Sequence, residues 1–96
     1  MMLVLPQALT QVEATACLRS LVQDLRKQSG ARMVVDASAL TRFDSAALAV
    51  LLEFRREVMA LGKQFSIRGL PARLADLATL YGIDELLTAE SADPVK

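Results

Sequence analysis

A repeated order of short apolar runs and longer stretches of helical period constrains this chain most. Apolar runs occur at 3–5, 33–35 and 64–68, the last alternating with polar residues, and each precedes a stretch whose apolar residues recur every three or four positions. When a helix connects two successive strands of one sheet, the two strands run parallel. The sequence therefore predicts an α/β fold, a small, largely parallel sheet covered by about three to four helices.

Three helices are expected, at about 10–29, 45–61 and 71–82, each followed or closed by glycine. The first starts at the capping box that Thr10 forms with Glu13. The continuous apolar run at 33–35 is typical of a central strand covered on both faces. The helical stripes expected to face the core comprise Ala14, Leu18, Leu21 and Leu25, then Ala47, Leu51, Phe54, Val58 and Leu61 widened by Leu48, Leu52 and Met59, then Leu74, Leu77, Ala78 and Tyr81.

The 96 residues are enough for one domain, which we place at 3–87, with 88–96 as a loose C-terminal tail. Lys and Arg number 11 and Asp and Glu also 11, so no excess charge recruits nucleic acid or an anionic membrane. No basic leader or spanning apolar run is present, which predicts a soluble, cytoplasmic chain. The single cysteine, Cys17, is expected to pack as a core thiol.

Two carboxylates, Asp36 and Asp44, flank the loop at the expected carboxyl end of the central strand. Such a pair could hold Mg²⁺ or accept a phosphoryl group, which would make the chain an enzyme. Local tasks explain both residues better, because Asp36 can tie down the loop and Asp44 can cap the next helix. With no histidine, no cysteine pair and no glycine-rich phosphate loop, we expect no catalytic residue, metal or cofactor.

Ser45 follows Asp44 at the start of the second helix, and two interpretations stay open for it. It begins the helix, or it is a hydroxyl that a partner reads or phosphorylates beside the free N–H groups. The outer face beyond it begins with Ala46, Ala49 and Glu53, so small residues there allow another surface to approach closely. A merely solvated, alanine-rich face is the alternative. The sequence predicts a partner-binding surface at Ser45, Ala46, Ala49 and Glu53.

The arrangement resembles a known family. The stretch VVDASALTRFDSAALAVLL, a following FSIRGL strand and a third helix are similar to the STAS domain, found in anti-sigma-factor antagonists, sulfate-transporter tails and MlaB-type subunits of bacterial lipid-transport ABC systems. The resemblance covers 3–87. The residues that carry it are Val35-Asp36, Phe43-Asp44-Ser45, Leu48, Leu51, Leu52 and Arg68-Gly69.

The ending LATLYGIDELL is similar to the MlaB type, in which a Leu-Tyr pair closes the third helix. This resemblance implies a non-enzymatic cytoplasmic subunit that docks on an ABC transporter ATPase and supports phospholipid transport that maintains outer-membrane asymmetry. Ser45 matches the family's hydroxyl position at the docking surface. The alternative is an anti-sigma-factor antagonist that a partner kinase switches by phosphorylating Ser45.

Three departures from the family pattern bear on these expectations. Ala47 stands where members usually have glycine, which alters a close backbone approach at that point. The first strand reads Leu5-Pro6-Gln7-Ala8-Leu9 instead of L-x-G-x-L. Members usually carry one more strand ahead of it, and its absence would leave an unprotected edge. A homodimer through the N-terminal strand edge is therefore an open alternative.

Overall fold

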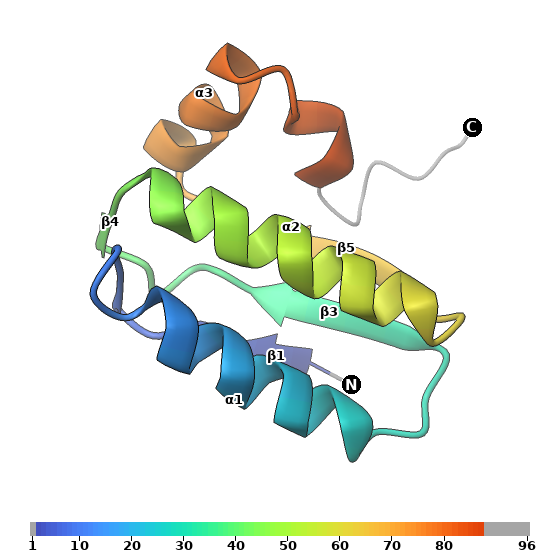
Figure 1. Cartoon of the computed structure of the whole chain (residues 1–96). Helices are drawn as coiled ribbons and strands as arrows, with labels where there is room; N and C mark the ends of the chain where they lie inside the picture. The colour runs from blue at the N-terminus through green and yellow to red at the C-terminus, as the bar shows by residue number, and fades with distance from the viewer. Residues whose placement is uncertain (1, 88–96) are drawn as a thin grey trace.

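A parallel sheet of three strands forms the centre of the computed structural model, which describes residues 2–87 (Figure 1). The strands, in spatial order, are β1 (Met2–Val4), β3 (Arg32–Asp36) and β5 (Gln64–Arg68). In register, Leu3 lies opposite Val35, and Val35 lies opposite Ile67. The predicted parallel sheet is confirmed, with β3 as its middle strand. The expected tail, 88–96, lies outside the described residues.

Within residues 2–87, three α-helices and one short 3-10 helix accompany the sheet, which confirms the predicted α/β class. They are α1 (Ala14–Arg26), α2 (Ser45–Ala60), α3 (Ala72–Leu80) and the 3-10 helix η1 (Asp84–Leu87). Figure 1 shows α1 and α2 side by side over one face of the sheet, with α3 on the far side of α2 from α1. The N-terminal half of α2 is therefore held between α1 and α3.

The expectation that β3 is covered on both faces is wrong. Met33 and Val35 are fully buried, but Val34 between them is only partly buried. On the same face as Val34, the β1 side chains Met2 and Val4 are 41% and 61% exposed. Both crossovers step across the sheet in one direction, and since such connections are right-handed, they place α1 and α2 on a single face. The other face carries no helix among the described residues.

A second, two-stranded parallel sheet was not predicted. Its strands are β2 (Ala8–Leu9) and β4 (Arg42–Phe43). The carbonyl of Gln7 extends the pairing by accepting from the N–H groups of Thr41 and Arg42, at 2.8 and 3.1 Å. Strands of two residues are too short for a period to appear in the sequence. Their pairing fixes the segment before α2 against the segment before α1, so the start of α2 has a defined position.

The predicted capping-box residues Thr10 and Glu13 interact, but they lie in a turn that precedes α1 and not in the first turn of the helix. A Glu13 Oε1 oxygen accepts from the Thr10 N–H at 2.7 Å and from the Thr10 hydroxyl at 2.6 Å. These bonds, the hydroxyl first, lower the pKa of the Glu13 carboxyl. The helix begins only at Ala14 and ends at Arg26, inside the expected range. The turn leads directly into α1, whose N-cap is Glu13, and the Gln11 N–H ties it to Asp44 at the start of α2.

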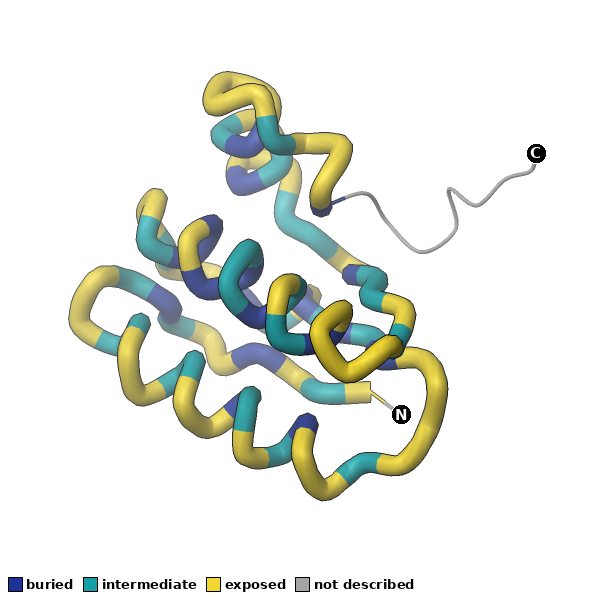
Figure 2. The backbone as a smooth tube through the Cα atoms, turned by 45° about the vertical axis from the view of Figure 1, so that its right-hand side comes forward, coloured by how far each residue is buried: buried dark blue, intermediate teal, exposed yellow. Residues whose placement is uncertain are grey.

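The buried side of α2 is wider than the predicted stripe at its start and narrower at its end. Val50 is 3% exposed, although the stripe omitted it, whereas Met59 and Leu61 are more than half exposed. Neighbours on both flanks bury the N-terminal half, while the C-terminal turn projects past them (Figure 2). Phe54 anchors the middle, with its ring edge-to-face against Phe65 at 6.1 Å.

Candidate partner-binding surface

Asp44 is the N-cap of α2 and joins two segments that are distant in sequence. Its backbone is extended, and its Oδ1 accepts from the Ala46 N–H at 2.8 Å. The other oxygen, Oδ2, accepts from the Gln11 N–H at 3.2 Å. The first bond is the cap that the sequence predicts, while the second was not foreseen. Asp44 thereby fixes the helix start against the turn that precedes α1.

Asp36 ties down the loop that follows β3. One oxygen, Oδ1, accepts from the Ser38 N–H at 2.9 Å and from the Ser38 hydroxyl at 2.6 Å. These bonds, the hydroxyl first, lower the pKa of the Asp36 carboxyl, and the charge of Arg68 adds to the effect. The described residues contain no cluster of three or more side chains suited to hold a metal ion. Both Asp36 and Asp44 thus have structural tasks in holding the loop and the cap.

Ser45 is the first residue of α2 and is exposed. Its hydroxyl makes no hydrogen bond to any residue in the described range 2–87. Because Asp44 provides the cap, the helix does not need the Ser45 side chain for that purpose. The hydroxyl is therefore available to solvent or to a partner at the positive end of the helix dipole.

The next turns of α2 present the small outer face that the sequence predicts. Ala49 is exposed, Ala46 is partly buried, and Glu53 is partly buried one turn beyond Ala49. Glu53 accepts from Arg56 at 3.2 Å, an exposed pair of little energetic weight. These four residues, Ser45, Ala46, Ala49 and Glu53, do lie along one side of the first three turns. We call them the α2 docking face.

Ala47, which replaces the family's glycine, lies outside the α2 docking face. It is fully buried, so its methyl group packs in the core beneath the helix. The expectation that this methyl alters the approach of a partner is not supported by its position. A core-facing alanine leaves the outer surface of α2 unchanged.

Sequence reasoning missed the apolar side chains that flank the α2 docking face. Val12 is 86% exposed and follows Gln11, whose N–H donates to Asp44. On the other flank, Leu80 at the end of α3 is 77% exposed. Leu80 lies outside the predicted α3 stripe and Val12 outside that of α1. A large apolar residue outside a core-facing stripe is the sequence signal that could have indicated this exposed apolar surface. Large apolar residues therefore lie on both sides of the α2 start.

Comparison with known proteins identifies one family. The family model described as "Mlab, STAS domain" matches residues 1–88. A search of curated proteins finds no match. Among the described helices, none combines the length and the apolar character that crossing a bilayer requires.

Proposed function

The chain belongs to the MlaB-type STAS domain family, and from this premise we propose that it is a non-enzymatic interaction module whose α2 docking face binds an ABC transporter ATPase. The transporter would be a phospholipid system of the kind that maintains outer-membrane asymmetry. The module would then lie at the cytoplasmic side of the inner membrane, held there by the complex. No cofactor is invoked for this role.

One observation carries the proposal: a fixed helix start presents small, exposed residues. Asp44 and the β2–β4 pair hold the beginning of α2 in place, so the α2 docking face is preorganised. Ala49 has no side chain beyond Cβ, and a partner helix or loop could approach its backbone closely. The flanking apolar residues Val12 and Leu80 add the buried area that a stable interface uses.

The non-enzymatic part of the proposal is supported by the tasks of the two carboxylates. Asp36 accepts from Ser38, and Asp44 accepts from Ala46 and Gln11. A carboxylate-dependent enzyme would lose turnover in an Asp36→Asn variant, whereas an interaction module would keep its affinity for the ATPase. The assay measures, on one preparation of the variant, its affinity for the ATPase and any metal-dependent turnover by the chain itself.

The test of the docking face is an Ala49→Arg variant. Arginine at the centre of a close contact should abolish copurification with the ATPase encoded in the same transporter system, a loss of about 100-fold or more. Ala49 is exposed and arginine is a good helix former, so the thermal melt should change little. Ala60→Arg, at the exposed far end of α2, is the matched control. Retained binding by Ala49→Arg would exclude this face.

A second candidate function is an anti-sigma-factor antagonist switched at Ser45. The observation that favours it is the exposed Ser45 hydroxyl, which makes no hydrogen bond to the described residues. A phosphate there would add about −1.5 to −2 charges directly on the α2 docking face. Mass spectrometry of the protein isolated from its own cells distinguishes the two roles, because the signalling role requires phosphate on Ser45.

A further inference from the structure

A groove opens beside the α2 docking face, between β4 and α3. It has a volume of about 420 Å³ and is lined by Phe43, Arg73, Asp76, Leu77 and Leu80. Phe43 and Leu77 are partly buried and pack against the core, which makes the base of the groove apolar and firmly held. We call this feature the Leu80 groove. Its volume falls in the range of small-ligand sites, so it can accept a large apolar side chain.

Leu80 is not needed to hold α3 in place. The buried residues of α3 are Leu74 and Ala78, while Leu80 is 77% exposed at the end of the helix. The exposed surface of Leu80 and the apolar base of the groove are still in contact with water. Covering them with an apolar group of a partner would lower the free energy by removing that surface from water. The groove is therefore open on the side that faces away from the core.

The rim of the groove carries an unused positive charge. Arg73 is exposed and forms no ion pair with the part of the chain that the structure describes. Asp76 also lines the groove, so the lining carries one positive and one negative charge and has no net charge. A partner with a carboxylate beside its apolar group would complement Arg73.

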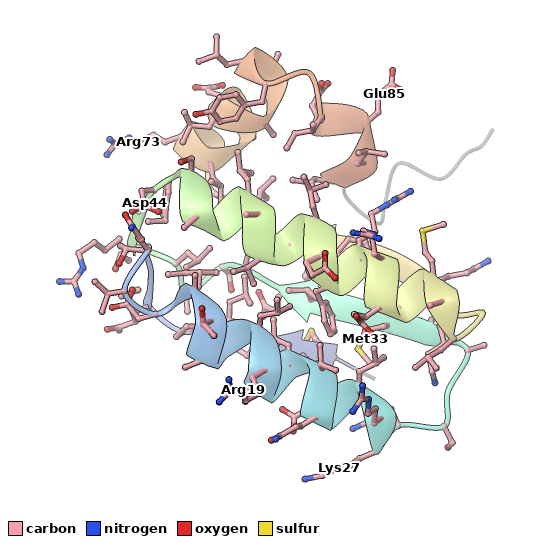
Figure 3. All side chains as sticks on the ribbon, viewed as in Figure 1. Arg19, Lys27, Met33, Asp44, Arg73 and Glu85 are labelled. Carbon is pink, nitrogen blue, oxygen red and sulfur yellow. The ribbon has the colours of Figure 1, made fainter. Side chains whose placement is uncertain are left out.

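The groove and the α2 docking face are continuous. Phe43 lines the groove, and the next two residues are the cap Asp44 and the exposed Ser45. Figure 3 shows Asp44 and Arg73 at the same end of the molecule, with Arg73 pointing outward from α3. A surface seated on Ser45 and Ala49 would therefore also lie over the groove.

Resting on the proposed function, we propose that the Leu80 groove receives a large apolar side chain of the same ATPase, followed or preceded by a carboxylate that pairs with Arg73. The apolar contact supplies affinity, because desolvated apolar anchors dominate interface energies. The charge pair supplies orientation and speeds association. The α2 docking face and the Leu80 groove then form one binding surface with two separately testable parts.

The experiment measures the affinity of the full chain for the purified ATPase subunit by calorimetry and by association kinetics. Leu80→Asp should weaken binding about 10- to 30-fold, and Leu61→Asp, at another exposed leucine (53% against 77% for Leu80) at the far end of α2, should not. Arg73→Glu should weaken binding about 5-fold at low salt, with slower association and a smaller effect at high salt. Arg19→Glu, exposed on α1, is its control. Leu80→Ala repeats the test without a new charge, should Leu80→Asp lower the melt.

The outcomes separate this inference from the proposed function. If Ala49→Arg abolishes binding while the Leu80 and Arg73 variants bind like the native chain, the groove has no role and only the inference falls. If Ala49→Arg also binds normally, or the native chain does not bind, the proposed function falls and the inference with it. If sedimentation shows that the native chain self-associates and Leu80→Asp disperses it, a second copy occupies the groove and the inference is overturned.

Discussion

Gly69 joins β5 to α3 with a left-handed backbone, φ 71°, and lies against Ser38 in the loop after β3. A Cβ built on Gly69 would lie 2.8 Å from the Ser38 Cβ and 3.1 Å from the Ser38 Cα and N. Two of these three atoms belong to the backbone, so no side-chain rotation relieves the contact. A Gly69→Ala substitution therefore displaces the loop that leads from β3 toward α2.

The cost follows from three contributions. The left-handed conformation costs an alanine roughly 1–2 kcal/mol. The reduced entropy of the unfolded chain returns about 0.4–1 kcal/mol. Forcing a methyl group into a packed contact adds about 1–3 kcal/mol. Gly69→Ala should therefore lower the free energy of unfolding by about 2–4 kcal/mol, a large part of the roughly 5–10 kcal/mol expected for a domain of this size.

Two other glycines provide matched controls. Gly62 and Gly82 have nearly the same φ, 76° and 74°, but a Cβ on either meets nothing within 4 Å. Urea unfolding of the three alanine variants should show losses of about 1 kcal/mol at Gly62 and Gly82 and a clearly larger loss at Gly69. Adding Ser38→Gly to Gly69→Ala should recover part of the difference. Equal losses at all three glycines would refute the argument from the Ser38 contact.

Three further predictions concern the cap, the thiol and the sheet edge. Asp44→Ala should lower the free energy of unfolding by about 1–2 kcal/mol, because the N–H groups of Ala46 and Gln11 lose their acceptor. Asp44→Asn should retain most of the native stability, and chemical denaturation of both variants measures the difference. Burial raises the pKa of the Cys17 thiol, and the charge of Glu13 adds to this, so iodoacetamide should react more slowly at about pH 8.5 with the folded chain than with the chain in urea. The stability gained from the neutral thiol is present below the unfolded pKa and is lost as pH rises through the folded pKa; a folded-state rate equal to that in urea would contradict the burial argument. If β1 pairs with a second copy, sedimentation should show a dimer that Val4→Lys disperses, and a monomeric native chain would exclude such pairing.

The order of elements was predictable because it rests on periods long enough to read. The apolar run ending at Val35 and the alternation around Ile67 gave strands that the structure confirms. The single helix-covered face was not foreseen, since a run of three apolar residues looks the same whether Val34 is covered or half open. That difference depends on the direction of both crossovers, which is a property of the whole sheet.

At the binding surface, the cap and the outer face were predictable, and their surroundings were not. Asp44 before a helical period indicates a cap from residue type alone. Its bond to Gln11 depends on the two-residue strands β2 and β4, which leave no period in the sequence. Tyr81 was expected in the core but is 56% exposed, because α3 ends at Leu80 and the chain turns away at Gly82. The Leu80 groove arises only when α3 packs beside β4.

Hydrogen–deuterium exchange of the chain, alone and with the ATPase subunit, tests the central claim most directly. The helix start carries the α2 docking face and α3 carries Leu80 and Arg73, so binding should slow exchange in peptides covering 42–57 and 73–82. Peptides covering 2–4 and 32–36, in the strands β1 and β3 outside the proposed binding surface, should exchange as in the free chain. Protection confined to those sheet strands, with the start of α2 unchanged, would contradict the account.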